Sequence, residues 1–460
     1  MKNEKIKQFF SDIRNWFKAL FTIQNGQEPK MLTFYKKDGT KSVLSSFLCI
    51  LAGVFVGFIV MLIIAAASPE ISARDAFKGL GIILGGPFSS GTAKYINMNF
   101  GDMIFYSGPL ILTGLSVAVA FKTGLFNIGA PGQFYMGTMG SLLVALSIPS
   151  KNGAEAFFIW FFAIIVGMCF GAMWGSIPGI FKALFGVNEV IVCIMTNWIS
   201  ANIVTWVFTS TPNLKNISMG KSDYLITTAV TGNGTPKIGL DKLFKGSYID
   251  LGIILAILVA IVLLIILNKT TFGYELKACG ANKHAAKYAG MNEKRNIILS
   301  MAIAGTLAAL GGALYYLNPG IEFRFGSAYG KLPGIPVALL ASSNPIGVIF
   351  SGIFLRYIAQ GGNELTSAGY NKYVADIIIA LIIYFAGFSK LLRDFITNRQ
   401  KKITSKIQLK IAKDNAESAL DEIEAEKEIE NETIGESIKE TVDETQDASP
   451  VNTDKKEIDD

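Results

Sequence analysis

Histidine and charged residues are scarce in this 460-residue chain. Only 17% of the residues are Asp, Glu, Lys or Arg, and His284 is the single histidine. A histidine without a second histidine, or a cysteine at ligand spacing, does not make a metal site, and one histidine in a basic loop argues against a Ser-His-Asp set. The sequence also lacks the GxxxxGK[ST] loop that cradles ATP phosphates and the HExxH metalloprotease motif. We therefore expect no metal, no cofactor and no catalytic residue.

Cysteine is nearly as rare as histidine. The four cysteines show no CxxC spacing. Cys49, Cys169 and Cys193 lie in apolar runs, and Cys279 lies in a basic stretch. Buried, reduced thiols are the simplest interpretation of this pattern.

Apolar residues dominate instead. They make up 51% of the chain, and the mean hydropathy is +0.41. These values are typical of a polytopic membrane protein, and the 46 glycines suit close helix packing in lipid. We therefore predict an all-α polytopic membrane fold.

The net charge of +6 combines two opposed parts. Residues 414–460 hold 18 acidic residues and 4 lysines, a net of −14, so the remaining chain carries about +20. A basic body favours an anionic inner membrane leaflet. It is not a nucleic-acid signal, because no basic patch alternates with exposed aromatics on a soluble domain.

Eight apolar runs are long enough to cross a bilayer. They are Val43–Ala67, Ile104–Phe121, Ile128–Ile148, Ala156–Phe181, Glu189–Phe208, Leu251–Leu267, Ile297–Leu317 and Tyr373–Leu392. A ninth stretch, Leu332–Ile358, is interrupted by prolines and by a turn at Ser342–Gly347. It predicts either two short spans or a re-entrant pair, so the chain crosses ten or eight times. Either number puts both termini on one side of the membrane.

Three regions follow from this pattern. Residues 1–42 form a basic leader, in which residues 4–24 have the spacing of an amphipathic helix on the inner membrane surface or on a partner subunit. Residues 43–395 form the transmembrane domain. Residues 396–460 form a tail that is acidic and disordered or loosely helical from residue 414. The basic leader and the cluster Lys390–Lys413 place both termini in the cytoplasm.

The basic stretch Lys269–Arg295 lies between two spans and carries six Lys or Arg residues. Two short helices are expected, Tyr274–Cys279 and Asn282–Ala289, and a basic loop of this kind belongs on the cytoplasmic face. Such a charged hairpin is suited to docking on a soluble motor, although a solvated loop is the alternative. The residues that would carry the docking are Glu275, Lys277, Gly280, Lys283, His284, Lys287 and Gly290.

Amide side chains inside the apolar runs are candidates for a substrate pathway. Asn127 and Gln133 stand in FNIGAPGQ, where two glycines and a proline break or delay a helix. Asn197 lies about two turns into the run that starts at Glu189. Amides can serve a neutral polar solute, but helix capping and contacts between helices are equally open alternatives.

Two charged residues, Arg356 and Asp376, stand inside or at the edge of apolar runs. An isolated charge at the centre of a bilayer costs roughly 2.5–3.5 kcal/mol on translocon scales. We therefore expect these two residues to pair with each other, to pair with a neighbouring chain, or to extend to the membrane surface.

Four stretches together resemble one family. They are FNIGAPGQ (126–133), NEVIVCIMTNWI (188–199), GYELKACGANKHAAKYAGM (273–291) and GIPVALLASSNPIG (334–347). The chain is similar, over residues 40–395, to the permeases of bacterial ABC importers for nucleosides and simple sugars, which are related to ribose and branched-chain amino acid permeases. It looks most like the nucleoside-uptake group, although Ala130–Pro131 stands where that group usually has an acidic residue.

The resemblance implies about ten helices, in a fold similar to the cobalamin importer permease. It implies a cytoplasmic ABC ATPase, a second, related permease in a heterodimer, and an extracellular lipoprotein that delivers the substrate. The chain itself would lie in the bacterial cell membrane. The expected cargo is a nucleoside, and a ribose-like or galactose-like sugar is the alternative. An ion-coupled secondary transporter would need a carboxylate near the midplane, and an intramembrane enzyme would need a catalytic set; neither is evident.

Overall fold

The structure is a computed structural model that describes residues 38–211, 214, 224–225, 231–324, 334–371 and 373–446. Within them the chain is almost entirely helical, as predicted for an all-α membrane protein. The chain forms two compact units, which divide between Val43 and Leu44 and between Leu392 and Arg393. The amphipathic helix expected over residues 4–24 lies outside the described residues.

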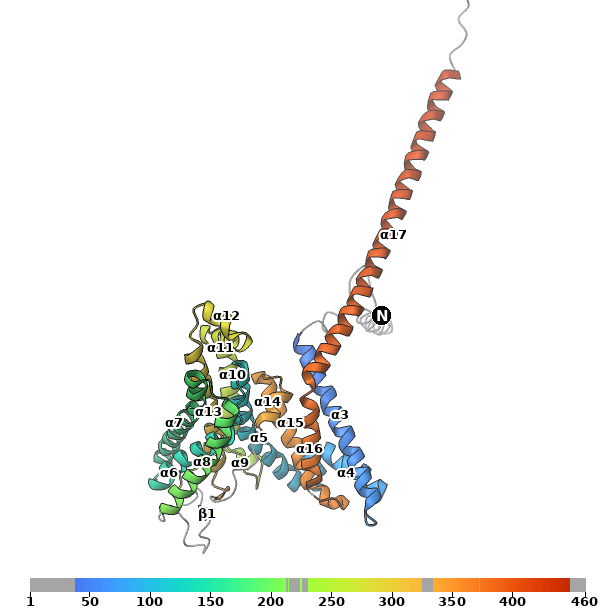
Figure 1. The fold of residues 1–460 in the computed structure, drawn as a ribbon. Helices are drawn as coiled ribbons and strands as arrows, with labels where there is room; N and C mark the ends of the chain where they lie inside the picture. Colours follow the sequence, from blue (N-terminus) through green and yellow to red (C-terminus); the bar gives the residue numbers. More distant parts are fainter. Residues whose placement is uncertain are drawn as a thin grey trace, which may run out of the picture. The chain divides into compact units, whose positions relative to one another are not determined.

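The elements follow one another along the chain (Figure 1). They are α3 (Asp38–Ala67), α4 (Ala73–Gly85), the 3-10 helix η1 (Gly86–Ser90), α5 (Ala93–Lys122), α6 (Ala130–Ser147), α7 (Gly153–Phe185), α8 (Glu189–Ser210), β1 (Tyr224–Leu225), α9 (Leu240–Leu243), α10 (Gly252–Lys269), α11 (Thr271–Ala281), α12 (Lys283–Tyr288), α13 (Glu293–Tyr316), β2 (Phe323–Arg324), α14 (Gly334–Leu340), α15 (Pro345–Asn363), the 3-10 helix η4 (Leu365–Ala368), α16 (Tyr373–Ala386) and α17 (Ser389–Gln446). The two short strands pair antiparallel, Tyr224 with Arg324 and Leu225 with Phe323.

Helices α5 and α13 form the centre of the larger unit. Most of each is buried, whereas α3, α7, α8 and α10 keep rows of large apolar side chains exposed. A water-soluble protein would bury such rows, so the outward apolar surface is that of a lipid-facing domain. Figure 1 shows α11 and α12 at one end of this unit and β1 at the opposite end.

A row of glycines lets α7 pack closely on α13. Gly167, Gly171, Gly175 and Gly179 recur every fourth residue along α7. A Cβ atom at Gly171 would lie 2.5 Å from the carbonyl oxygen of Gly305, and one at Gly175 would lie 2.5 Å from that of Met301. Backbone therefore meets backbone along this interface, the arrangement that small residues permit between membrane helices.

Asparagines begin five of the helices. Each side-chain oxygen accepts a hydrogen bond from a backbone N–H two or three residues ahead, which satisfies a donor that the first turn leaves open. The capping residues are Asn152, Asn188, Asn282, Asn292 and Asn344. At α8 the predicted start is confirmed, and Glu189 in its first turn also pairs with Lys182 of α7 at 2.7 Å.

Six helices of the described residues are long and apolar enough to cross a membrane. The number becomes seven if α16 and the first part of α17 form one broken span. Helices α6 and α15 have 18 and 19 residues, but they are not apolar enough to be counted among these spans. The expected total of about ten crossings remains a prediction.

The interrupted segment after residue 332 is broken as the sequence indicates. Helix α14 has 7 residues, about 10 Å, and is too short to cross a bilayer. Ser342 and Ser343 then take positive φ angles of 49° and 55°, and Asn344 caps α15. Two consecutive non-glycine residues in the left-handed region make a sharp turn that regular helix cannot accommodate.

The second unit contains most of α17. Within it the guanidinium of Arg399 lies 5.7 Å from the centre of the Phe395 ring. The stretch from residue 414 to Gln446 also belongs to α17. The division into leader, transmembrane domain and tail, with an acidic end that is disordered or loosely helical, remains a prediction.

Candidate functional site

The basic stretch folds as a helical hairpin, α11 and α12, which we call the coupling hairpin. Thr270 accepts a hydrogen bond from the N–H of Gly273 at 3.1 Å and begins α11, and Asn282 accepts one from Ala285 at 3.1 Å and begins α12. Gly290, with φ of 80°, ends the hairpin. Both expected helical pieces are therefore present.

A buried amide fixes the hairpin to α13. The Asn296 side chain, which is 1% exposed, donates a hydrogen bond to Oε2 of Glu275 at 3.0 Å. Its nitrogen also lies 3.6 Å from Sγ of Cys279, which is buried with Leu276. Glu275 is thus engaged within this chain, where it sets the position of α11 relative to α13.

Gly280 makes the second attachment of the hairpin. A Cβ atom there would lie 2.9 Å from the carbonyl carbon of Lys122 and 3.0 Å from the nitrogen of Gly124. Next to this contact, the hydroxyl groups of Thr123 and Ser300 lie 2.6 Å apart. The hairpin is therefore packed directly on the connection between α5 and α6.

The opposite face of the hairpin is open. Tyr274 is 64% exposed and Tyr288 is 94% exposed, and His284 and Lys287 lie on the surface between them. Lys283 is half-buried, and Nζ of Lys277 lies 3.5 Å from Oδ1 of Asn268. A surface of cations and exposed tyrosines can bind a protein partner that carries acidic side chains. The role of these residues in docking remains a prediction.

The predicted pathway amides Asn127 and Gln133 come together in the core. Nδ2 of Asn127 donates to Oε1 of Gln133 at 2.9 Å and to Oγ of Ser116 at 3.2 Å. Nε2 of Gln133 returns a bond to Oδ1 of Asn127 at 3.2 Å, and the N–H of Gly129 donates to the same oxygen at 3.0 Å. Both side chains are at most 1% exposed.

Asn197 of α8 completes this amide cluster. Its Oδ1 accepts a bond from the N–H of Gly132 at 2.9 Å, and its Nδ2 donates to the carbonyl oxygen of Ile128 at 3.0 Å. All three amides are thus occupied by protein groups and shape the turn before α6. A substrate would have to replace these bonds, so their part in the pathway remains a prediction.

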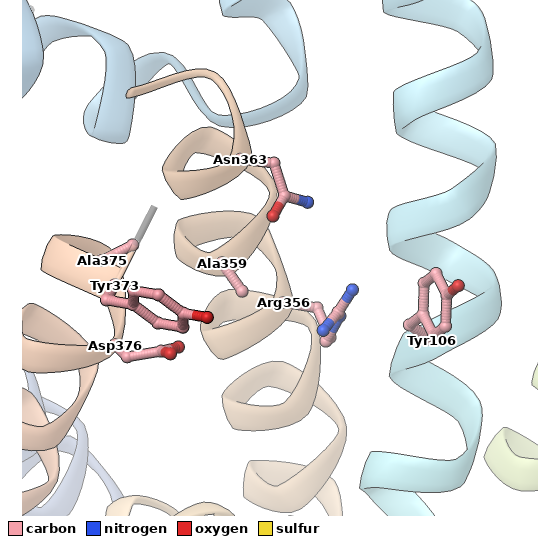
Figure 2. A pocket seen from close by; sticks show the side chains of 7 residues that line it. All are labelled: Tyr106, Arg356, Ala359, Asn363, Tyr373, Ala375 and Asp376. Atoms are coloured by element: carbon pink, nitrogen blue, oxygen red, sulfur yellow. The ribbon is translucent and has the colours of Figure 1, made fainter. Parts of the chain in front are cut away.

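Arg356 and Asp376 line one cavity of about 300 Å³ between α5, α15 and α16 (Figure 2). No ion pair joins them within the described chain. The guanidinium carbon of Arg356 instead lies 4.5 Å from the centre of the Tyr106 ring, and Asp376 is exposed on the other wall. Of the arrangements expected for these two charges, the mutual pair is not formed.

Several of these residues do not stand out in the sequence. Tyr106 stands inside an apolar run, and Asn296 precedes one by a single position, so neither breaks a pattern.

Asp250 was equally inconspicuous, because it directly precedes the apolar run Leu251–Leu267, most of which forms α10. It is 1% exposed and accepts hydrogen bonds from the N–H of Gly252 at 2.8 Å and from Nδ2 of Asn318 at 2.7 Å. Burial raises the pKa of Asp250 to about 7.

Comparison with known proteins gives a consistent result. Residues 99–387 match the family model described as the permease component of branched-chain amino acid transport systems. The nucleoside ABC transporter permease protein NupB of Lactococcus lactis is 36% identical over 349 residues, which cover 75% of this chain and 91% of NupB. The guanosine ABC transporter permease protein NupP of Bacillus subtilis is 35% identical over 334 residues, 70% of this chain and 91% of NupP.

A more distant relative carries a different name. The glucose ABC transporter permease protein TsgB13 of Haloferax volcanii is 28% identical over 294 residues, 62% of this chain and 74% of TsgB13. No solved structure matches this chain.

Proposed function

This chain belongs to the family of permease components of branched-chain amino acid transport systems, and on that premise we propose that its cargo is a nucleoside. It is the multi-pass membrane permease of an ABC transporter, a transport subunit rather than an enzyme. The observation that carries the cargo proposal is the match to NupB and NupP, each of which is named for nucleoside or guanosine transport and is aligned over 91% of its length.

The coupling hairpin is the part of the chain that an ATPase would hold. Its exposed cations and tyrosines form one face, while Glu275 and Gly280 attach the other face to α13 and to the α5–α6 connection. A force applied to α11 and α12 therefore reaches the amide cluster through the short stretch between Lys122 and Asn127. This arrangement supports a cycle in which the ATPase moves the hairpin and opens the pathway to the inside.

The chain works with an ATPase and a substrate-binding partner, as permeases of this family do. We infer that it pairs with a second, different permease and receives its substrate from an extracellular lipoprotein. A second nucleoside permease protein of Lactococcus lactis, NupC, is 24% identical to this chain over 266 residues, which supports a pair of related subunits. The basic leader and the basic start of α17 support termini, and a coupling hairpin, on the cytoplasmic side.

Uptake measurements test the cargo proposal. Cells that carry the complete transporter and cells that lack this chain are given labelled guanosine, uridine, ribose or glucose. We expect nucleoside uptake to fall when the chain is absent and sugar uptake to stay the same. Unchanged nucleoside uptake with lost sugar uptake would reject the proposal in favour of the sugar alternative. The similarity to TsgB13, which is named for glucose transport, supports that alternative.

A further inference from the structure

We propose that the cavity between α5, α15 and α16 binds the base of a 6-oxopurine nucleoside such as guanosine, and that Arg356 and Asp376 recognise the base. This inference rests on the proposed function and narrows its cargo. The site is distinct from the amide cluster: α15 runs antiparallel to α5, and its Arg356 lies beside Tyr106, which precedes Lys122 by 16 residues, about 24 Å along α5. With the coupling hairpin inside the cell, the cavity lies in the outer half of the domain, where a delivered substrate arrives first.

Arg356 carries one donor that is buried without a partner among the described residues. A guanidinium has five N–H donors, and the Nε–H of Arg356 is fully buried with no hydrogen bond. Burying a donor without an acceptor is unfavourable, so this group points to an acceptor atom that arrives with a ligand.

The guanidinium of Arg356 is already held in place. It lies over the Tyr106 ring, and that ring packs edge-on against Tyr248 with centres 6.4 Å apart. Tyr315 lies on the same ring at 5.9 Å. Asp102, which accepts a hydrogen bond from the N–H of Tyr248 at 2.9 Å, adds a negative charge on this side. A cation fixed in this way loses little freedom when it binds, which favours affinity.

The two walls of the cavity differ in their hydrogen-bonding groups. Arg356 offers only donors, whereas the Asp376 carboxylate on α16 offers only acceptors; Figure 2 shows Asp376 and Tyr373 on the wall opposite Arg356. Guanine carries two neighbouring acceptors, O6 and N7, which suit a guanidinium, and its N1–H and N2–H donors suit a carboxylate. Adenine would instead direct its N6 amino donor toward Arg356.

The size of the cavity agrees with this ligand. Its volume of about 300 Å³ lies at the lower end of the range for small-molecule sites. Behind it, Gly362 of α15 packs closely on Ala375 of α16, so the two helices that form most of the wall are in contact. The cavity is therefore a defined recess and can accept a base while the ribose faces the pathway.

Competition for uptake tests the inference. Labelled guanosine is supplied to cells with the complete transporter, and unlabelled guanosine, inosine, adenosine and uridine are added over a range of concentrations. For the original chain we expect guanosine and inosine to compete at concentrations at least tenfold lower than adenosine. The change R356K keeps the charge but removes the planar fork, and D376N replaces two acceptors with one acceptor and one donor.

We expect R356K to raise the concentration of guanosine needed for half-maximal uptake by about 5- to 150-fold, the worth of one bidentate pair. D376N should reduce the preference for guanosine over adenosine. R399K is the matched control, because Arg399 also lies over an aromatic ring, that of Phe395, but outside the permease domain; it should leave uptake unchanged.

The outcomes separate the two proposals. If the original chain supports no nucleoside uptake, the proposed function fails and this inference fails with it. If it carries uridine but not guanosine, the proposed function stands and the inference is overturned. The inference is also overturned if R356K lowers the maximal rate for all nucleosides equally, which is the result expected of a residue that only supports the fold.

A second measurement reads the site without changing Arg356. In the variant N363C, a thiol stands on the cavity wall, and its reaction with a maleimide is followed in membranes that still transport guanosine. Guanosine should slow the reaction severalfold and adenosine should not. The unsubstituted chain, in which Cys169 is exposed, gives the background. A rate that guanosine leaves unchanged would contradict the assignment.

Discussion

Gly280 of the coupling hairpin lies directly against the backbone of Lys122 at the end of α5, with no side chain between them. The contact joins the part of the chain that an ATPase would hold to the connection that leads into the amide cluster. The contact leaves no room for a Cβ atom, so a displacement of α11 is passed on to the α5–α6 connection rather than absorbed by side chains.

The change G280A tests this contact. A Cβ atom at this position would press on the backbone of Lys122 and Gly124, and such overpacking costs about 1–3 kcal/mol. We expect at least a tenfold loss of uptake and weaker co-purification with the ATPase. G81A is the control, because a Cβ atom at Gly81 meets nothing within 4 Å. Equal uptake by the two variants would contradict a coupling role for Gly280.

Charge reversal on the exposed face of the hairpin is a separate test. The double change K283E and K287E should weaken binding of the ATPase, because it replaces attraction to acidic side chains by repulsion. The loss should be greatest at low ionic strength, since salt screens exposed charges. Co-purification at low and high salt measures it. K242E, at an exposed lysine of α9, is the control and should have no effect. Binding that is insensitive to both changes would favour the solvated-loop alternative.

The amide cluster can be tested at Asn197. N197A leaves the N–H of Gly132 and the carbonyl oxygen of Ile128 without their partner, which costs about 1–3 kcal/mol when the groups are buried. We expect a lower melting temperature in detergent and reduced assembly. The substrate concentration for half-maximal uptake then decides the pathway role: a change in that value, at full assembly, indicates contact with substrate, and no change indicates a structural amide.

Asp250 makes stability depend on pH. Its pKa of about 7 in the folded chain lies above the value of about 3.9 in an unfolded chain, so the folded state binds the proton more tightly. The contribution of Asp250 to the free energy of unfolding is present in full below about pH 4 and is lost as the pH rises through 7. We therefore expect a higher melting temperature at pH 5 than at pH 8.

The variant D250N separates this effect from the hydrogen bonds. Its amide nitrogen would face Nδ2 of Asn318, whose Oδ1 is already occupied by the N–H of Gly320, so a donor would meet a donor. We expect D250N to be less stable than the original chain and to lose the difference between pH 5 and pH 8. A pH dependence that survives in D250N would assign it to another group.

The sequence was a good guide wherever local rules decide the structure. Long apolar runs predicted the spans, and Asn188 and Asn282 stood where helices begin. The basic stretch Lys269–Arg295, between two apolar runs, was expected to hold two short helices, and both are present. These features depend on a few neighbouring residues, so they can be predicted from the sequence without knowledge of the fold.

Contacts between residues that are distant in the sequence could not be predicted in this way. Nothing in the sequence shows that Asn296 holds Glu275, or that Tyr106 lies under Arg356, because both pairs depend on how helices pack. The same limit applies to Asn127 and Gln133. Their spacing suggested a polar opening in the membrane, and only the packed structure shows that they bind each other.

The glycine row of α7 has a consequence for any inward opening of the transporter. Because Gly171 and Gly175 touch the backbone of α13 over successive turns, the two helices cannot slide past each other without first separating. They should travel as one block during transport. The change of shape then falls on weaker points, and the sharp bend at Ser342 and Ser343, directly before α15, is one of them.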